Sequence, residues 1–429
     1  MPGALDGIRV LEIAQVMAIP ICGVLLSDMG ADVVKLEPPW GDASRYTMQP
    51  VFPGESKSFA VLNRGKRSVC LDIADERSRP ALEALVRWAD VVLVSLKDAD
   101  LDAYRIAYDH LRELKPDMIY LEHVGLGHLG PMGGLGSYDL VVTGLAGVTA
   151  LIGREREGQP QYTQPAITDM GTGYLSAMAV CAALYARQTT GQGQRIETSL
   201  LATGMMTVGN VAHDFRAVDP GVREEFLTGL AEARARGASY GDLQAHRDRT
   251  VNRGRHGNIY YRYYKTLDSF ISVGCLSPAL QARYREVTGL RDPRREPGFA
   301  ARTEEGWESI GRFVAEAEAL MQSRTTAEWT ELFGQHKIPC GPVSFPEEAI
   351  NDPQVTENEF VIDLDHELLG TYRTYAPPVR MDATPTRAQG PAPPLGKHTE
   401  AVLREVGLDA DAVASLVRAG VAGARPLEG

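Results

Sequence analysis

The chain has 429 residues, of which 44% are hydrophobic and 23% are charged. This length is large for one compact core and predicts two domains, and the composition is that of an ordinary globular protein. The formal net charge of −12 argues against nucleic acid and anionic membrane surfaces as the main partners. A polyanionic ligand would therefore need a local cluster of basic residues.

The cysteines and histidines show no pattern typical of a metal site or a disulfide framework. The five cysteines are far apart, without a CxxC pair, and the nine histidines include no HExxH sequence. We therefore expect no bound metal and a reducing, cytoplasmic compartment. The N-terminus has no basic segment followed by an apolar one, as a signal peptide would. The longest charge-free runs, 13–27 and 170–186, are short for a membrane span.

The first 40 residues predict a βαβ unit. Residues 8–13 and 32–37 are strand-like apolar runs, and Pro20 suits the first turn of a helix that ends near Asp28. Such a unit is the start of a parallel sheet. No GxGxxG sequence follows the first strand, so a dinucleotide site has little support. The loop 14–19 nevertheless lies at the carboxyl end of a strand, where open α/β sheets bind their ligands.

The next 110 residues continue the alternation of strands and helices. Further strands are expected at 69–73, 91–95 and 118–122. Helices are expected at 78–88 and over a segment that opens at 137–140 and ends around 153.

Asp169 stands where a polar, extended stretch gives way to a long apolar helix, 174–187, which a glycine turn and a strand follow. We expect Asp169 at or just before the helix N-terminus, where free N–H groups and the positive end of the helix dipole favour an ionised carboxylate. An ionised carboxylate in a partly dry pocket is a possible nucleophile. The alternative role for such an Asp is a helix N-cap.

Beyond residue 212 the pattern changes. Residues 212–256 are polar and rich in arginine, which is typical of a solvent-facing linker, with an active-site lid as the alternative. A hairpin near 260–273 and helical stretches around 303–335 follow, and the Pro-rich stretch 377–396 leads into a terminal helix.

Several motifs along nearly the whole chain resemble those of the family III CoA-transferases, which include formyl-CoA, carnitine and benzylsuccinate CoA-transferases. The matching segments are Gly41–Arg45 (G-D-x-x-R), Asn63–Ser68 (N-x-x-K-R-S), Gly125–Pro131 (G-L-G-x-x-G-P), Asp169 with its small-residue helix and the turn Thr190–Gln194 (T-G-x-G-Q), and Ile338–Val343 (I-P-C-G-P-V).

The resemblance implies the roles of particular residues. Asp169 would be the catalytic nucleophile. The expected CoA contacts are Val16, Met17 and Ala18 at the pantetheine and reacting centre, Leu71 and Ile73 at the adenine, and Lys97 and Arg105 at the phosphates. Leu96, beside Lys97, is also expected to contact CoA. For Lys97 and Arg105 the alternative is that both are ordinary solvated surface cations.

The implied reaction moves CoA from an acyl-CoA donor to a carboxylic acid acceptor through an anhydride and then a thioester at Asp169, with no permanently bound cofactor. A 2-methylacyl-CoA racemase on the same fold is one alternative. Those racemases place a His where this chain has Tyr138, and a tyrosine with an ordinary pKa of about 10 is a poor base for a carbon acid. A non-catalytic acyl-CoA-binding protein is the other alternative, suggested by departures from the family at Met17, Pro38 and Leu96. The intact Asp169 segment argues against it.

The predicted fold is α/β, with a large Rossmann-like domain built on a parallel sheet and a smaller α+β domain. The expected divisions are 1–215 for the first part of the large domain, 216–256 for the charged linker or lid, 257–345 for the small domain, and 346–429 for the segment that completes the large domain. The resemblance further implies a homodimer of interlinked chains.

Overall fold

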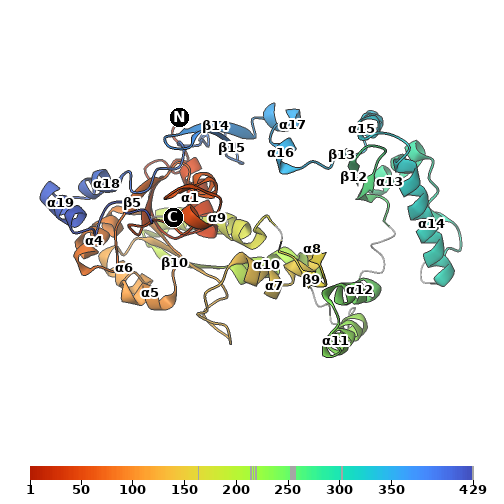
Figure 1. The fold of residues 1–429 in the computed structure, drawn as a ribbon, viewed down its shortest axis with the longest axis horizontal. Coiled ribbons are helices and arrows are strands. Elements are labelled where there is room, and N and C mark those ends of the chain that lie inside the picture. The colour runs from red at the N-terminus through yellow and green to blue at the C-terminus, as the bar shows by residue number, and fades with distance from the viewer. Residues whose placement is uncertain are drawn as a thin grey trace. The chain divides into compact units, whose positions relative to one another are not determined.

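The computed structural model describes residues 1–427 except 163, 213–214, 216, 218–219, 252–257 and 301–302. The chain forms two compact units, one made of residues 1–213 and 356–429 and the other of residues 214–355. Both ends of the chain therefore belong to the first unit, as the red and blue ends of the ribbon show (Figure 1).

A parallel six-stranded sheet forms the centre of the first unit, in the order β10-β7-β6-β1-β2-β5. The strands are β1 (Arg9–Ile13), β2 (Asp32–Glu37), β5 (Arg67–Cys70), β6 (Val91–Val94), β7 (Ile119–Val124) and β10 (Gln194–Ser199). The central strand β6 is the unbroken apolar run Val-Val-Leu-Val, and all four residues are buried. Such a run is typical of a parallel strand covered on both faces. The predicted α/β class with a parallel sheet is confirmed.

Helices cover both faces of this sheet. One apolar core joins the sheet to α4 (Arg79–Trp88), α6 (Tyr108–Leu114), α18 (Thr399–Glu405) and α19 (Ala410–Arg418). A second core joins the opposite face to α1 (Ala18–Asp28) and α9 (Ile167–Thr190). In Figure 1 the blue C-terminal helices α18 and α19 lie beside β5 and α4, so the end of the chain completes the first core.

The helices α1 and α9 cross very closely at Gly173. A Cβ atom at Gly173 would lie 2.6 Å from the carbonyl oxygen of Ala18 and 2.9 Å from the Cβ of Ile21. Real Cβ atoms do not approach backbone this closely, so only glycine fits here. This crossing holds the first turn of α9 beside the start of α1.

Two helix boundaries differ from those expected. The helix expected to open at 137–140 and to end around 153 is two helices, α7 (Asp139–Leu145) and α8 (Val148–Ile152), because Gly147 between them has a left-handed backbone with φ 84°. The helix expected to begin at 174 begins at Ile167, so Asp169 lies inside its first turn and the N-cap is Ala166.

The second unit contains a three-stranded antiparallel sheet of β11 (Tyr261–Lys265), β12 (Phe270–Gly274) and β13 (Cys340–Pro342). An aromatic core packs it against α13 (Pro278–Thr288), α14 (Glu304–Met321) and α15 (Thr326–Gln335). The segment expected as a charged linker or lid contains two helices, α11 (Pro220–Ala235) and α12 (Tyr240–Thr250), and its residues 216, 218–219 and 252–256 lie outside the described part.

The remaining strands and α-helices of the described chain are short. They are α2 (Ser44–Thr47), β3 (Pro50–Phe52), β4 (Glu55–Ser56), α3 (Lys57–Leu62), α5 (Asp98–Ala103), β8 (Glu155–Arg156), β9 (Gln159–Pro160), α10 (Leu200–Val208), α16 (Pro346–Ala349), α17 (Pro353–Thr356), β14 (Val361–His366) and β15 (Gly370–Tyr375). Among the described helices, α9 alone has the length and apolar composition of a membrane span. It packs against α1 and the sheet, as the core helix of a globular protein does.

Candidate active site

A cavity of about 620 Å³ lies in the first unit, at the carboxyl ends of β1, β6 and β7. Its wall comes mainly from the loops that follow these three strands, together with residues of α9 and α10. This is the edge at which open α/β sheets bind ligands. Its volume is within the range typical of small-molecule sites.

The cavity brings together most of the residues predicted for the site. Those that line it are Val16, Met17, Ala18, Leu96, Lys97 and Asp169. Leu71 and Ile73 instead belong to the apolar core between the sheet and the C-terminal helices, where Leu71 is only 1% exposed. Arg105 is exposed after α5, with its carbonyl accepting a hydrogen bond from the side chain of Arg79, and it does not line the cavity.

Asp169 is half-buried in the cavity wall. Burial, and after it the negative charge of Asp139, raises the pKa of Asp169 from 3.8 to about 7. The sequence predicted that the helix N-terminus would favour the ionised form, but loss of water and a second carboxylate oppose it. Asp169 therefore changes its charge near neutral pH.

The second carboxylate, Asp139, occupies the N-terminal N–H groups of α9. It accepts hydrogen bonds from the backbone N–H groups of Thr168 (2.8 Å) and Asp169 (3.1 Å), from the Thr168 hydroxyl (2.5 Å), and from the Tyr162 hydroxyl (3.2 Å). Asp139 thus caps a helix that begins 28 residues further along the chain. Sequence reasoning missed this role, and the signal available was an acidic residue at the start of a helix after a glycine-rich loop.

Two other polar residues in the wall carry a buried atom without a partner. These atoms are Nδ1 of His123 and Oγ of Ser137, which have no hydrogen-bond partner among the described residues. Burial lowers the pKa of His123 to about 4, so its imidazole is neutral at physiological pH. An imidazole with so low a pKa is a weak base, and His123 therefore gives the racemase alternative little support.

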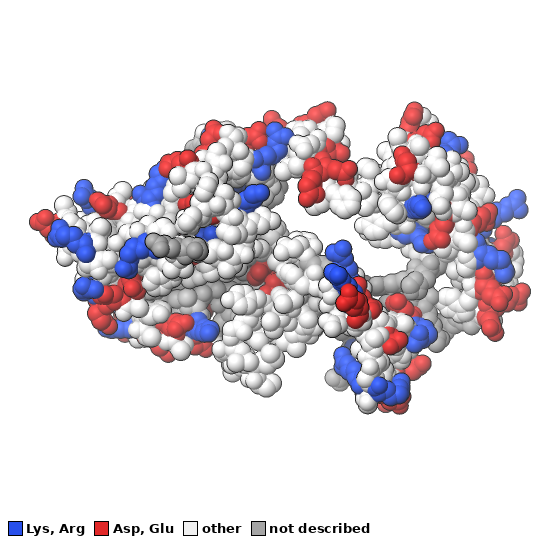
Figure 2. Space-filling model, in the orientation of Figure 1, with Lys and Arg blue, Asp and Glu red and all other residues white. Residues whose placement is uncertain are grey.

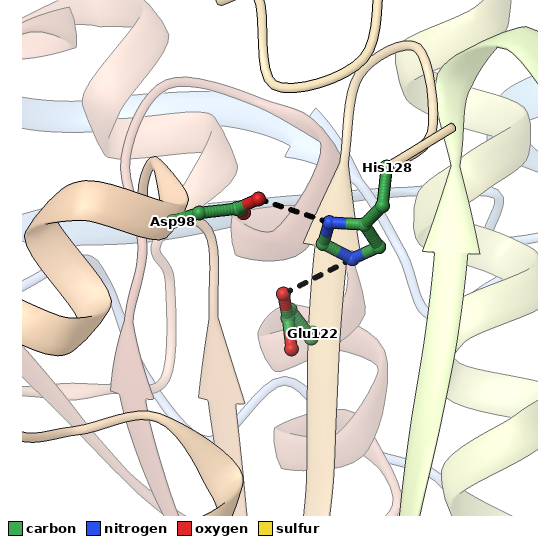
Figure 3. A group of neighbouring side chains, drawn as sticks. All are labelled: Asp98, Glu122 and His128. Carbon is green, nitrogen blue, oxygen red and sulfur yellow. Dashed lines mark hydrogen bonds and ion pairs between the residues drawn. The ribbon is translucent and has the colours of Figure 1, made fainter. Parts of the chain in front are cut away.

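A cluster of acidic and imidazole groups lies at the rim of the cavity, with Asp98 and His128 lining it. Figure 3 shows the imidazole of His128 between two carboxylates, at 3.1 Å from Asp98 and 3.4 Å from Glu122. Side-chain atoms of these three residues lie within 4.8 Å of one another, which is a grouping that can hold a divalent ion. Arg195, however, already pairs with Glu122 at 2.9 Å. The arrangement is satisfied as an ion-pair network, and we assign no metal to it.

The charge of the wall is mixed. Among the described residues that line the cavity, Lys97 is the single Lys or Arg, and Asp98 and Asp100 lie close to it in sequence. A polyanionic ligand would need a cluster of basic residues, and the described residues of this cavity wall provide one basic group, the ammonium of Lys97.

Comparison with known proteins fits this fold and site. Residues 5–399 match the sequence profile of CoA-transferase family III. The chain is 29% identical over 410 residues to the formyl-CoA:oxalate CoA-transferase of Rhodopseudomonas palustris (strain TIE-1), covering 95% of this chain and 94% of the relative. It is 30% identical over 416 residues to the succinate–glutarate CoA-transferase of Agrobacterium fabrum, covering 94% and 95%.

A solved structure agrees over the same extent. The crystal structure of a CAIB/BAIF family protein from Brucella suis matches with a TM-score of 0.72 at 26% identity, covering 95% of this chain and all of that one. The fold, the carboxylate at the ligand-binding edge and these full-length matches define an enzyme that transfers CoA. The chain belongs to CoA-transferase family III, as its motifs predicted.

Proposed function

We propose that this enzyme moves CoA from an acyl-CoA donor to a carboxylic acid acceptor by covalent catalysis at Asp169. The observation that carries the proposal is the position of Asp169: it shares one cavity wall with Val16, Met17 and Ala18, the residues implied to contact the pantetheine. With a pKa of about 7, an appreciable fraction of Asp169 is ionised at neutral pH. A partly dry carboxylate is a better nucleophile than one fully solvated by water.

The reaction consists of four displacements. The Asp169 carboxylate attacks the thioester carbonyl of the donor, the C–S bond breaks, and an aspartyl–acyl anhydride and CoA thiolate form. The thiolate attacks the Asp169 carbonyl and releases the donor acid, which leaves an aspartyl-CoA thioester. The acceptor carboxylate then attacks this thioester, and the released thiolate attacks the acceptor carbonyl of the new anhydride. Free Asp169 and the new acyl-CoA result, with no net change in protons.

We further propose that the acids are small carboxylic acids. The two relatives above act, by their names, on formyl-CoA and oxalate and on succinate and glutarate. Lys97, the one ammonium group among the described residues of the wall, is available either to a CoA phosphate or to a second carboxylate of the substrate.

We also propose a homodimer of interlinked chains in the cytoplasm. The support in this chain is an exposed apolar face: Tyr174, Met178 and Tyr185 of α9 are 48%, 63% and 72% exposed. Figure 2 shows an area almost free of charged side chains over α7 and α10. Burial of such a face against a second copy would remove apolar surface from water.

A substrate screen tests the proposal. A panel of short acyl-CoA donors is paired with mono- and dicarboxylic acids, and new acyl-CoA is detected by mass spectrometry. We expect transfer for at least one pair and none with Asp169→Asn. Exchange of the donor's α-hydrogen in deuterated water without transfer would favour the racemase, and binding of CoA without either reaction would favour the non-catalytic alternative.

A further inference from the structure

The loop between β1 and α1 has a strained backbone at Val16. Val16 has φ 69°, in the left-handed region, although it is neither glycine nor asparagine. A β-branched residue seldom adopts this conformation because its Cβ substituents crowd the backbone. The next residue, Met17, is the N-cap of α1, and its side chain makes no cap hydrogen bond. Since Val16 and Met17 both line the cavity, the strain lies in the wall of the site.

A buried ion pair holds this loop from both sides. The ammonium of Lys35 donates to the carbonyl of Ala14 at 2.7 Å, and the backbone N–H of Val16 donates to Asp42 at 3.1 Å. Lys35 and Asp42 are themselves 2.9 Å apart, and both side chains are 0% exposed. Lys35 therefore holds Ala14, Asp42 holds Val16, and the ion pair between Lys35 and Asp42 links the two contacts.

Further contacts hold both members of the pair in place. Asp42 also accepts hydrogen bonds from the N–H and the hydroxyl of Ser44, each at 2.8 Å. Lys35 also pairs with the buried Glu12 at 3.0 Å. Burial alone would neutralise both groups, but their partners raise the pKa of Lys35 and lower the pKa of Asp42, so both remain charged.

We propose that Lys35 and Asp42 are positioning residues for acyl-CoA: they hold Val16 in its left-handed conformation so that Val16 and Met17 form the cavity wall. This inference rests on the proposed function, because it takes the cavity to be the acyl-CoA site. The strain that the pair maintains serves binding and not folding. A variant that relieves this strain should therefore lose affinity for acyl-CoA without losing stability.

Three variants test the inference. In Asp42→Asn the amide cannot pair as an anion with Lys35, and we expect the KM for acyl-CoA to rise roughly five- to tenfold with a smaller change in kcat, because the wall binds ground and transition states alike. The matched control is Asp28→Asn, which breaks another buried pair, Asp28 with Arg64 at 2.6 Å, away from the cavity. It should lower Tm and leave KM unchanged.

The third variant, Val16→Gly, accepts a positive φ without strain, so we expect an unchanged or higher Tm together with a raised KM.

A readout independent of transfer separates this inference from the proposed function. Hydrogen exchange of the amides in 14–17 should be faster in Asp42→Asn than in the wild type and in Asp28→Asn. If Asp42→Asn does not fold, Ser44→Ala removes one donor to Asp42 and should show the same changes more weakly. Equal KM values in Asp42→Asn and Asp28→Asn, or unchanged exchange in 14–17, would overturn the inference. If the wild type transfers CoA to none of the acids tested, the proposed function fails. The inference is then tested by hydrogen exchange in 14–17 and by acetyl-CoA binding, measured by calorimetry, in the wild type and the variants.

Discussion

Two carboxylates with different surroundings meet at the start of α9. Asp139 is buried and accepts four hydrogen bonds from α9 and Tyr162, whereas Asp169 is half-buried at the cavity and carries a pKa raised to about 7. Two carboxylates in different surroundings can take different roles in one site. Here Asp139 stabilises the start of α9, and Asp169 is the carboxylate that faces the cavity. The charge of Asp139 is also a cause of the raised pKa of Asp169.

The pH dependence of transfer should report this pair. Since the proposed nucleophile is the ionised form of Asp169, kcat/KM should rise with pH through about 7. Asp139→Asn removes a negative charge near Asp169 and should lower its pKa, because charge repulsion then no longer opposes ionisation. The rising limb of the pH–rate profile should therefore move to lower pH in this variant. A limb at the same pH in both proteins would show that Asp139 does not affect the ionisation of Asp169.

The same pKa makes a prediction about stability. Asp169 has a pKa of about 7 when folded and 3.8 ordinarily, so the folded state binds more protons between these values, and stability falls as the pH rises from about 4 to about 7. Asp169→Asn removes this loss. Its Tm should exceed that of the wild type clearly at pH 8 and less at pH 5.5, as measured by differential scanning fluorimetry. A Tm difference that is the same at both pH values would be inconsistent with the raised pKa.

At the scale of the elements, the crossing of α1 and α9 sets the position of Asp169, the proposed nucleophile. Gly173 lies one helical turn after Asp169, and its missing side chain lets α9 approach the Ala18 carbonyl. The loop 14–17 enters α1 at that same point. Close packing of two helices thus sets the distance between the predicted pantetheine contacts and Asp169.

Substitution of Gly173 should therefore affect both fold and chemistry. Gly173→Ala places a methyl group 2.6 Å from a carbonyl oxygen, and we expect a loss of about 1–3 kcal/mol in the free energy of unfolding together with a fall in kcat. Gly144→Ala in α7 is the control, since a Cβ there meets no described atom within 4 Å. It should be neutral or stabilising by up to about 1 kcal/mol. Chemical denaturation measures the free energy of unfolding, and steady-state kinetics measures kcat. Equal losses in Gly173→Ala and Gly144→Ala would contradict this account.

The elements that the sequence predicts well are those whose signal is local. Continuous apolar runs such as 91–94 indicate buried parallel strands. Val16 was predicted from the loop after the first strand and Lys97 from the resemblance to the family, and both line the cavity at the carboxyl ends of the strands. The start of α9 at Ile167 was missed because its capping group, Asp139, is distant in sequence. The sequence likewise does not predict the proposed role of Lys35 and Asp42, because that role depends on contacts that the folded chain makes with Ala14 and Val16.

At the scale of the whole molecule, the proposed dimer accounts for the exposed apolar face of α9. Tyr174, Met178 and Tyr185 recur at helical spacing on one side of a helix whose other side packs on the sheet. A net charge of −12 favours solubility, whereas apolar surface of this kind normally marks an interface.

A charge on this face should weaken the dimer. Met178→Glu should shift the molecular mass measured by light scattering toward that of one chain, because a buried unpaired carboxylate costs several kcal/mol. Val417→Glu, on the exposed side of α19, is the matched control and should leave the mass unchanged. If the chains are interlinked, tagged and untagged wild-type dimers should also form mixed dimers only slowly. A monomeric wild type would exclude the proposed assembly.

In the proposed mechanism Asp169 becomes covalently attached to substrate. The most direct measurement is mass spectrometry of the peptide that contains Asp169 after incubation with a donor acyl-CoA, followed by hydroxylamine or borohydride. We predict a hydroxamate with the first reagent and an alcohol with the second, both at Asp169, and neither in Asp169→Asn, because a neutral amide is a poor nucleophile. Transfer at the wild-type rate in Asp169→Asn, or transfer without any adduct on this peptide, would contradict the account.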